Sequence, residues 1–446
     1  MALSGLDIYK LLPKTNTGDC GCPTCLAFAM KVAAKQASIE QCPHLSVEAR
    51  RILGAAGAPP QKLIKVGSGP NAIEIGNETV MFRHEEKFHH KPGVAVAVND
   101  TDDVQQKAAR IKALQFERVG ETIAVNCVAV KCASGDAARM KDAASGVHAA
   151  LGLPMVLIAR SAAHLVDAAK ALKDARPLLW ERGGPSDALL TLAAETKLPV
   201  VVEGTLEKCD ADTQKAKSKG VEDIVLSPGD VGPAEALQFL TCARRAALRH
   251  NYRPLGYPAI VCAQSKDPAQ QSLEACHYVA KYAGIVVMTV DSPEYVLSVL
   301  TMRQDIYIDP QKPVQVQAKV YDVGEPDDKA PFLVTTNFSL TFYNVLGEVE
   351  ASRVPARVLA VDTEGTSVLT AWAADKFGPQ QIKAAIDKSG VFQKLAEKHR
   401  RPVIPGLVAV ISGELQEELG VPVIVGPKEA TGIGSFLKNQ WRSLVG

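Results

Sequence analysis

The sequence lacks several features that would assign it to a familiar class. Its first stretch, MALSGLDIYKLLPKTNTG, has no basic start followed by an apolar run, so we expect no signal peptide. No apolar stretch reaches the length of a transmembrane helix. Basic residues exceed acidic ones by only one charge, which gives no electrostatic footprint for nucleic acid. We therefore expect a cytoplasmic protein with neither a membrane nor a nucleic-acid partner.

Aromatic residues are also few, at 5% of the chain, whereas alanine and valine are frequent. This usage is typical of α/β proteins, in which small residues pack helices against sheets. With 446 residues, the chain is long enough for two to four domains with ample cores.

Cysteine is sparse over most of the chain but not at its start. Six of the ten cysteines lie singly in apolar or helical contexts and are expected to be small buried hydrophobes. The other four are Cys20, Cys22, Cys25 and Cys42, in the order C-x-C-x2-C-x16-C. Because structural disulfides are rare in the cytosol, clustered cysteines there more often bind metal.

The spacing of these four cysteines favours an iron–sulfur cluster. Structural zinc usually takes paired C-x2-C knuckles, whereas three packed cysteines closed by a remote one are typical of a cuboidal cluster. Gly18, Gly21 and Pro23 supply turns, and Cys42–Pro43 repeats a habit of ferredoxins. A zinc knuckle or an unligated loop is the alternative.

Eight short apolar runs fill the middle of the chain, and each is followed by a helical segment. The runs cover residues 94–98, 122–130, 155–159, 177–181, 199–204, 223–227, 258–263 and 284–290. The helical segments include 161–175, 233–248 and 292–300, the last with Ser292 as its expected N-cap. Continuous apolar strands indicate a parallel sheet buried on both faces, and eight strand–helix units match a TIM barrel.

Polar residues follow several of these strands, where the chemistry of a barrel is normally found. They are Asn99, Asp100, Glu181, Arg182, Glu203, Asp230 and Asp291. They include neither a metal trio nor a recognisable nucleophile, so we expect no catalytic residue. The rim is either a ligand mouth or a docking face, and we favour docking.

Residues 58–93 read as a connector before the barrel. The segment NAIEIGNETVMF alternates enough for a small hairpin with Gly76–Asn77 at its turn. His84, His89 and His90 have no fixed helical or strand spacing, so a solvated connector is favoured over a metal site.

After the barrel, residues 309–331 are rich in proline and aspartate and indicate a domain boundary. The last 115 residues predict a second α/β unit with strands over 332–338, 357–363, 404–411 and 422–427. No G-x-G-x-x-G follows the first of these strands and no G-x-x-x-x-G-K-[ST] is present, so nucleotide binding is not supported.

Small and hydroxylic residues gather at the carboxyl ends of these strands, where open α/β sheets bind ligands. They are Thr335, Thr336, Asn337, Ser339, Thr341, Asp362, Thr363, Gly365, Thr366, Ser367, Gly426, Thr431 and Gly432. Any single one could simply cap a helix. Three such loops at one sheet edge nevertheless predict a broad, uncharged, hydrogen-bonding pocket.

The chain resembles a known family over its whole length. The resemblance rests on GLDIYKLLPKTN and PTCLAFAMK near the start, on GYPAIV and MRQDIYIDPQ near the end of the barrel, and on VTTNFSLTFY, VDTEGTSVLTAW and GPKEATGI beyond it. The family is the large subunit of the corrinoid iron–sulfur protein of the acetyl-CoA pathway, whose archaeal counterpart is the gamma subunit of acetyl-CoA decarbonylase/synthase.

The resemblance implies a domain order that agrees with the boundaries above. It gives a 4Fe–4S cluster domain (1–57), a linker (58–93), a TIM barrel (94–308), a second linker (309–331) and a Rossmann/flavodoxin-like corrinoid-binding domain (332–446).

The cysteine pattern departs from that of the family, which is C-x2-C-x4-C-x16-C. Its last three cysteines fall on Cys20, Cys25 and Cys42, and its first falls on Thr17. A neutral hydroxyl is a much weaker ligand for iron than a thiolate. We therefore expect Cys22 to supply the fourth sulfur of the 4Fe–4S cluster, and the alternative is a cluster with three cysteine ligands.

The resemblance further implies a methyl carrier rather than a stand-alone enzyme. The corrinoid cobalt accepts a methyl group from methyltetrahydrofolate on a separate methyltransferase and passes it to acetyl-CoA synthase/CO dehydrogenase. The 4Fe–4S cluster serves to reduce inactive Co(II) back to Co(I). A smaller TIM-barrel subunit completes a heterodimer. The alternatives are a pterin-binding TIM-barrel methyltransferase and an electron-transfer iron–sulfur flavoprotein.

The corrinoid is expected at the C-terminal loops. The residues expected to bind it are Thr335, Thr336, Asn337, Thr341, Gly365, Thr366, Ser367, Val368, Thr370, Gly426, Ala430 and Gly432. The chain has no D-x-H-x-x-G motif, and His399 is the only histidine in the last 115 residues. We therefore expect the cobalamin-type cofactor to be bound base-off without a protein axial ligand, and His399 to be a surface residue.

Overall fold

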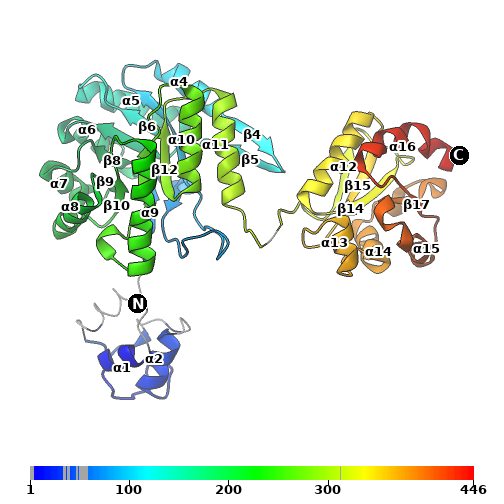
Figure 1. Ribbon diagram of the computed structural model, residues 1–446, viewed down its shortest axis with the longest axis horizontal. Coiled ribbons are helices and arrows are strands. Elements are labelled where there is room, and N and C mark those ends of the chain that lie inside the picture. Colours follow the sequence, from blue (N-terminus) through cyan, green and yellow to red (C-terminus); the bar gives the residue numbers. More distant parts are fainter. Residues whose placement is uncertain are drawn as a thin grey trace. The chain divides into compact units, whose positions relative to one another are not determined.

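The computed structural model describes residues 5–33, 37, 41–46, 49, 59–311 and 313–445 (Figure 1). The chain divides into two compact units. One comprises Met1–Phe116 and Ala124–Tyr307, and the other comprises Glu117–Ile123 and Ile308–Gly446.

Two short helices form the described part of the N-terminal region. They are α1 (Gly5–Leu11) and α2 (Cys25–Ala33), which pack against each other. Ile8 of α1 and Leu12, just after α1, pack with Phe28 and Ala29 of α2. All four side chains are buried. This small apolar core fixes where the loop between the two helices can run.

A two-stranded antiparallel sheet precedes the barrel. Its strands are β1 (Ile64–Val66) and β2 (Ile73–Ile75), with η2 (Gly69–Asn71) between them. The expected hairpin with its turn at Gly76–Asn77 is therefore wrong, because β2 pairs with a strand upstream of it. Gly76 and Asn77 do have positive φ angles, but they follow the paired strands instead of joining them.

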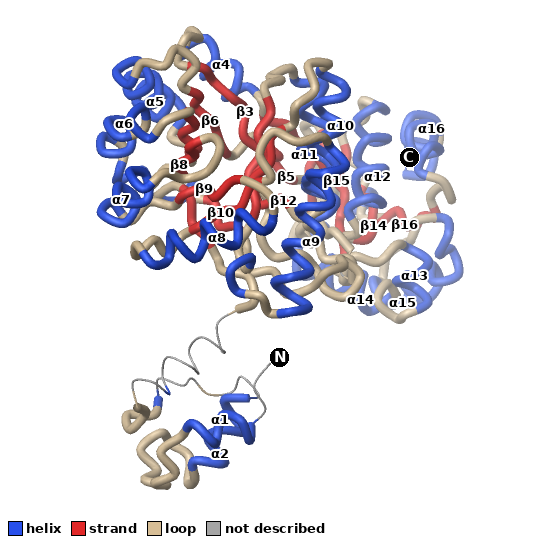
Figure 2. The backbone as a smooth tube through the Cα atoms, turned by 60° about the vertical axis from the view of Figure 1, so that its left-hand side comes forward, coloured by secondary structure: helices blue, strands red, loops and turns tan. Residues whose placement is uncertain are grey.

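The central region is a closed barrel of eight parallel strands, as the sequence predicts. The strands are β3 (Gly93–Asn99), β6 (Cys127–Lys131), β7 (Met155–Ala159), β8 (Leu178–Glu181), β9 (Val200–Glu203), β10 (Ile224–Ser227), β11 (Ala259–Cys262) and β12 (Ala283–Met288). They are almost entirely buried, and Figure 2 shows them as a ring of strands surrounded by helices.

Eight helices follow the eight barrel strands in turn. They are α4 (Val104–Ala113), α5 (Ala137–Leu151), α6 (Val166–Ala171), α7 (Asp187–Thr196), α8 (Leu206–Ser218), α9 (Pro233–His250), α10 (Pro268–Ala280) and α11 (Pro293–Ile306). The last three begin with proline, whose fixed φ suits the first helical position. Single 3-10 turns flank some of them: η3 (Ala162–His164), η4 (Lys173–Ala175) and η5 (Arg253–Leu255).

Two expectations within the barrel need correction. The run 122–130 is not one strand, because a hairpin of β4 (Gln115–Arg118) and β5 (Glu121–Ala124) ends before β6 begins. Asn126 breaks the run, since its side-chain oxygen accepts bonds from the backbone of Val94 and the guanidinium of Arg303. The expected helix over 161–175 is divided into η3, α6 and η4.

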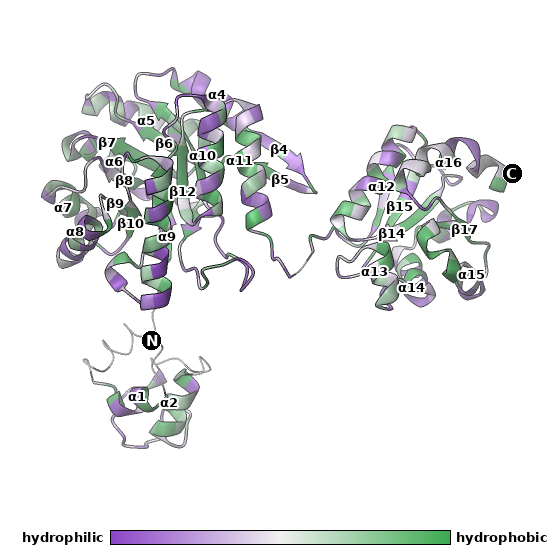
Figure 3. Cartoon of the chain, in the orientation of Figure 1, coloured by the Kyte–Doolittle hydropathy of each residue, from purple (hydrophilic) through white to green (hydrophobic). Residues whose placement is uncertain are grey.

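Beyond the barrel lies an open five-stranded sheet in the order β13-β15-β14-β16-β17. Strands β14 (Phe332–Thr336), β15 (Ala356–Val361), β16 (Pro402–Ile404) and β17 (Ile424–Val425) are parallel. Strand β13 (Val320–Val323) pairs antiparallel with β15 at one edge. In Figure 3, the strands of this sheet are apolar, as are the strands of the barrel.

Helices cover both faces of this sheet. They are α12 (Ser339–Ser352), α13 (Val368–Ala373), α14 (Pro379–Ser389), α15 (Ser412–Leu419), α16 (Ile433–Asn439) and α17 (Trp441–Val445), with 3-10 turns η6 (Phe392–Lys394), η7 (Glu397–His399), η8 (Gly406–Ile411) and η9 (Ala430–Gly432). One core centres on Phe332 and Phe377, and the other on Phe342 and Phe436. A sheet buried on both faces explains its continuous apolar strands.

Two features of this region differ from the sequence-based expectation. The expected linker 309–331 contains β13, which is hydrogen-bonded to β15. The expected strand over 404–411 is wrong, because the strand β16 ends at Ile404 and residues 406–411 form η8. Pro405 separates the two elements, and the backbone of Gly406 bonds to Pro427 on the neighbouring segment.

Within the described residues, no helix is both long enough and apolar enough to cross a lipid bilayer.

Candidate functional site

The four N-terminal cysteines line one small cavity. Cys20, Cys22, Cys25 and Cys42 all contribute to its wall, together with the ring of Phe28. All but Cys20 are buried in the apolar cluster of the N-terminal helices. The sequence-predicted set is thus brought together around a common space.

The loop before α2 is shaped by residues with left-handed backbone conformations. Gly18 and Gly21 have φ angles of 81° and 74°, and the N–H of Gly21 donates to the carbonyl of Gly18 at 2.9 Å. The side-chain oxygen of Asn16 accepts the N–H of Cys25 at 2.8 Å, which satisfies a free donor at the start of α2. The loop therefore curls back onto the helix and brings its cysteines inward.

Thr17 and Cys22 differ sharply in their surroundings. Thr17 touches the same cavity but is exposed, whereas Cys22 is only 4% exposed. Hydrogen bonds from His44 and then Thr17 hold the pKa of Asp19 below its usual range. The hydroxyl of Thr17 is thus engaged with a neighbouring carboxylate, while the sulfur of Cys22 belongs to the apolar wall.

Within the described residues, no three histidine, cysteine, aspartate or glutamate side chains converge closely enough to hold a single metal ion. The cavity that the four cysteines line measures about 10 Å³, which is smaller than a cluster of several iron atoms. The four thiols nevertheless supply the donor set of such a cluster, whose ligands lie at separate corners.

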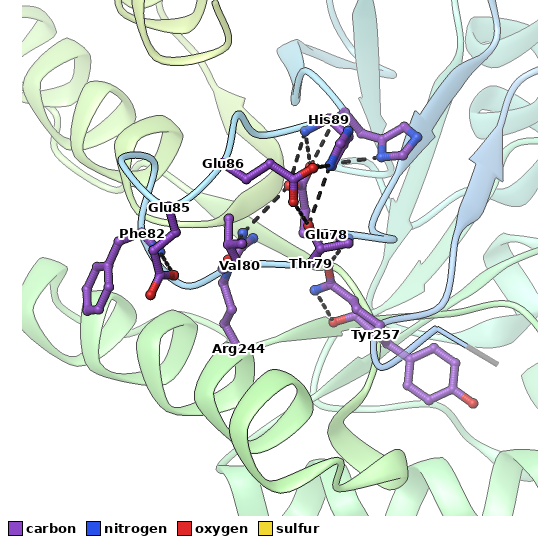
Figure 4. A network of polar contacts seen from close by, with 11 residues as sticks. Glu78, Thr79, Val80, Phe82, Glu85, Glu86, His89, Arg244 and Tyr257 are labelled. Atoms are coloured by element: carbon purple, nitrogen blue, oxygen red, sulfur yellow. Dashed lines mark hydrogen bonds and ion pairs between the residues drawn. The ribbon is translucent and has the colours of Figure 1, made fainter. Parts of the chain in front are cut away.

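His89 and His90 lie where the connector before the barrel is attached to helix α9. Their backbone N–H groups donate to the carboxylate of Glu78 at 2.9 and 2.8 Å (Figure 4). Glu78 also lies 3.6 Å from Arg244 of α9, and both side chains are buried. Arg244 in turn donates to the carbonyl of Val80 at 3.0 Å. The connector is therefore held to the barrel by a buried ion pair.

A second cavity lies at the carboxyl ends of β14, β16 and β17. It measures about 190 Å³. Strand β14 lies between β15 and β16, so the chain leaves it toward opposite sides of the sheet in successive connections. This is a topological switch point, the place where open α/β sheets bind ligands.

Five of the residues expected to bind the corrinoid line this cavity: Thr335, Thr341, Val368, Gly426 and Ala430. The others do not line it: Thr336, Asn337, Gly365, Thr366, Ser367, Thr370 and Gly432. The cavity was expected to be uncharged, but Lys428 and Glu429 also line it. The expectation rested on small and hydroxylic residues in three loops, and Lys428 and Glu429 lie between two of these residues, Gly426 and Thr431.

Asn337 is a structural residue of this edge. Its side-chain oxygen accepts from the N–H and hydroxyl of Thr363, both at 3.0 Å, and from the N–H of Gly365 at 3.1 Å. Gly365 has a φ of 74°, and a side chain there would meet Gln315. Ser367 and Thr370 bond to each other at the start of α13. These residues shape the loops around the cavity.

Three buried hydroxyls at this edge have no hydrogen-bond partner in the described part of the chain. They belong to Thr335, Thr336 and Ser339. A buried hydroxyl without a partner is costly, and Thr335 is the one that lines the cavity. A polar ligand group that entered the cavity could satisfy it.

His399 lies away from the cavity. Its ring packs against that of Trp441, with centroids 6.4 Å apart, and its Nδ1 is buried. The residue as a whole is half-buried, so the expectation of a surface residue holds only in part. Among the described residues that line the cavity, none is a histidine.

Known proteins are similar to this chain over almost its whole length. The chain is 41% identical to the corrinoid/iron-sulfur protein large subunit of Moorella thermoacetica, over 98% of this chain and 99% of that protein. This chain belongs to that family. It is also 32% identical to the gamma subunit of the acetyl-CoA decarbonylase/synthase complex of Methanopyrus kandleri, over 98% of both chains. The resemblance found in the sequence is confirmed.

Two family models match parts of the chain. Residues 63–437 match the CO dehydrogenase/acetyl-CoA synthase delta subunit, and residues 12–44 match a putative Fe-S cluster region. The second match contains all four clustered cysteines. Among solved structures, dihydropteroate synthase of Thermus thermophilus is 16% identical, covers 55% of this chain and 99% of its own, and has a TM-score of 0.39.

In this family member, most acidic residues of the barrel rim hold loops. Asp100 accepts from the backbone N–H groups of Ala133 and Ser134 at 2.9 Å. Glu181 accepts from the N–H groups of Ala162 and Ser186. Asp291, after β12, pairs with Lys107 of α4, and Asp102 accepts the backbone N–H of Asn99 within one loop. Of the expected rim, Arg182 and Asp230 line a cavity at the barrel mouth.

Proposed function

We propose that the chain is the methyl-carrying subunit of the acetyl-CoA pathway, with a corrinoid at the edge of its C-terminal sheet and a 4Fe–4S cluster in its N-terminal cavity. The observation that carries this proposal is the 41% identity to a corrinoid/iron-sulfur large subunit over nearly the whole of both chains. Both cavities described above lie in the regions where the sequence predicts these groups.

The cysteine cavity fits a 4Fe–4S cluster by its donor set. Four thiols line it, three of them buried, and apolar side chains such as Phe28 exclude water. Hydrogen bonds to the sulfurs and limited solvent access set the reduction potential of an iron–sulfur cluster. Cys20, Cys22, Cys25 and Cys42 would be its ligands, and the engaged hydroxyl of Thr17 supports Cys22 as the fourth.

The switch-point cavity, at about 190 Å³, is too small for the broad ring of a corrinoid, so the part of the cofactor that would enter it is the narrower nucleotide tail. The unpartnered hydroxyl of Thr335 offers a hydrogen bond inside it. Gly426 has no room for a side chain, because a Cβ there would meet Val403 at 2.9 Å. The lack of a D-x-H-x-x-G motif supports base-off binding without a protein axial ligand.

When bound, the corrinoid would supply a nucleophilic cobalt that takes up and releases a methyl group, and the cluster would supply the electron that restores oxidised cobalt. The chain itself binds, orients and shields these groups. The loops tied together by Asn337 hold the rim of the corrinoid site in one shape. No side chain of the chain needs to exchange a proton in this role, which fits a carrier that works with separate enzymes.

Partners follow from the exposed face at this edge. Leu369 and Trp372 of α13 are 47% and 41% exposed, and Leu407 and Val410 of η8 are 41% and 75% exposed. The two elements are in contact, and Leu407 also lines the cavity. An apolar face beside a ligand site supports docking of another protein. We assign it to a smaller TIM-barrel subunit that shields the corrinoid, with methyltetrahydrofolate methyltransferase and acetyl-CoA synthase/CO dehydrogenase as later partners.

The proposal is tested by measuring cobalt, iron and the visible spectrum of the anaerobically purified full chain and of two matched variants. Ala430→Trp fills the switch-point cavity, whereas Ala409→Trp places the same ring on an exposed position of η8 that does not line it. We expect Ala430→Trp to lose cobalt and retain iron, and Ala409→Trp to retain both.

The full chain should be purified from cells that make corrinoids. If it then contains flavin and no cobalt, the proposal is contradicted and the chain is a flavoprotein. Retention of full cobalt by Ala430→Trp, with a normal unfolding transition, would show that the corrinoid lies elsewhere.

A further inference from the structure

The mouth of the barrel contains a cavity that the methyl-carrier function does not use. It measures about 220 Å³ and lies at the carboxyl ends of the barrel strands. Lys131 ends β6, Arg182 follows β8, Cys262 ends β11, and Thr289 follows β12. In barrels of this kind, ligands bind at this face.

The positive charges of the cavity are not all neutralised. Arg182 is paired, with its Nε 3.0 Å from Glu203 and its Nη2 2.6 Å from Asp230. Lys131 also lines the cavity and is half-buried, but its ammonium has no hydrogen-bond or ion-pair partner within the described residues. Lys266, on the loop after β11, is likewise unpaired there. Lys131 helps Arg182 to lower the pKa of Asp230, but among the described residues it makes no close contact that would stop an anion from binding its ammonium.

The charges act on the interior of the cavity. Burial raises the pKa of the Cys262 thiol, and Lys131 followed by Arg182 opposes that rise. Asp230 is the single carboxylate in the described lining, and it already bonds to Arg182 and to the side-chain amide of Gln264. The open part of the cavity is therefore electropositive.

The loop after β11, which lines the cavity, is held in place by side chains of α10. Glu274 of α10 accepts the backbone N–H groups of Gln264 and Ser265, at 2.7 and 3.1 Å. Gln271, one turn earlier on the same helix, donates to the carbonyl of Ser265 and accepts from the N–H of Thr289. Both α10 side chains are buried. A site whose walls are fixed in advance loses little free energy in ordering when a ligand enters.

We propose that this cavity binds a small oxyanion, a carboxylate or phosphate, through the ammonium of Lys131 and the hydroxyl of Ser265, with Lys266 over the opening. Charge-assisted bonds to such groups are among the strongest in proteins. The cavity is below the usual size of sites for drug-sized ligands, which limits the occupant to a small molecule. None of its lining residues lines either proposed cofactor cavity.

The test uses the full chain, with inorganic phosphate and acetate as separate probes and chloride at equal ionic strength as the screening control. Acetylation of each lysine is followed by mass spectrometry with and without millimolar probe. We expect protection of Lys131, while Lys170, an exposed lysine of α6 that does not line the cavity, is labelled at the same rate throughout. Protection by phosphate alone or acetate alone would identify which oxyanion the site prefers.

Calorimetry on Lys131→Met and the matched control Lys170→Met gives a second readout. Loss of one charge-assisted contact should weaken binding about tenfold in the first variant and leave the second unchanged. Equal labelling of Lys131 with and without both probes would overturn the proposal, as would unchanged affinity in a folded Lys131→Met variant. The wild-type protection measurement stands even if that variant fails to fold.

Discussion

The side-chain oxygen of Asn337, just beyond β14, accepts the backbone N–H of Gly365, in the loop after β15, at 3.1 Å. The same oxygen accepts two bonds from Thr363, and the amide nitrogen of Asn337 donates to Asp362 at 3.2 Å. One buried side chain thus joins the loops of two neighbouring strands. Some residues of the hydroxyl-rich loops therefore hold the loops around the cavity together and do not line the cavity themselves.

Replacing Asn337 by leucine should therefore destabilise the C-terminal unit. The change leaves three donors on Thr363 and Gly365 without their acceptor, and a buried unsatisfied group costs about 1–3 kcal/mol. Urea unfolding monitored by circular dichroism measures the loss. Asn344→Leu is the matched control, because Asn344 is exposed on α12 and should change stability by less than about 0.5 kcal/mol. Equal effects of the two changes would contradict the framing role.

The N-terminal cavity predicts an asymmetry between Cys22 and Thr17. Cys22→Ser should greatly lower the iron content, because a buried thiolate donor is lost. Thr17→Val should leave it unchanged, since that hydroxyl is exposed and engaged with Asp19. Iron analysis and electron paramagnetic resonance of the reduced proteins distinguish the two. Iron loss in Thr17→Val with full iron in Cys22→Ser would reverse the assignment.

The buried pair of Glu78 and Arg244 should contribute strongly to stability. Arg244→Met leaves the Glu78 carboxylate buried without its cation, and breaking such a pair costs about 3–5 kcal/mol. Arg249→Met, on the same helix, is the matched control because its pair with Glu85 is exposed and is worth less than about 1 kcal/mol. Thermal unfolding of both variants gives the comparison. If the two midpoints fall equally, the connector is not held by this pair.

Two barrel cysteines should be inert in the native protein. Burial raises the pKa of both Cys127 and Cys209 to about 12, so almost no thiolate forms at neutral pH. Their contribution to stability is fully present below the unfolded value of 9.0 and is lost as the pH rises toward 12. Alkylation with iodoacetamide followed by mass spectrometry should label neither residue in the native chain at pH 8. Half-exposed Cys242 is the internal control, and rapid native labelling of Cys127 would contradict its burial.

The barrel was predictable because each of its strands is a continuous apolar run and each is followed by a helix. The predicted strand boundaries were wrong where a single polar residue or a proline interrupted an apolar run. Asn126 ends a hydrophobic run by accepting a bond from Arg303, a partner 177 residues away. Pro405 ends a strand that hydropathy alone extends to residue 411. Strand β13 was not predicted because it lies at the edge of the sheet and only its last residue, Val323, is buried.

The candidate sites were predictable to different degrees. The four cysteines are close in sequence or joined by one helix, so local spacing was enough to bring them together. The switch-point cavity depends on strand order, which no single segment encodes. The sequence pattern therefore indicated Thr335 and Gly426, which directly line the cavity, but could not separate them from Asn337, which shapes it through contacts with a second loop.

The apolar face of α13 and η8 makes a final prediction about assembly. Val410 is 75% exposed and does not line the switch-point cavity, so Val410→Glu should disturb docking without filling the corrinoid site. A buried, unpaired carboxylate at an interface is strongly unfavourable. We expect the smaller subunit to copurify poorly with this variant while its cobalt content after reconstitution stays normal. Leu297→Glu is the control, because Leu297 is an exposed leucine on α11 of the barrel. Size-exclusion chromatography with light scattering measures the outcome, and undiminished heterodimer in Val410→Glu would place the partner on another face.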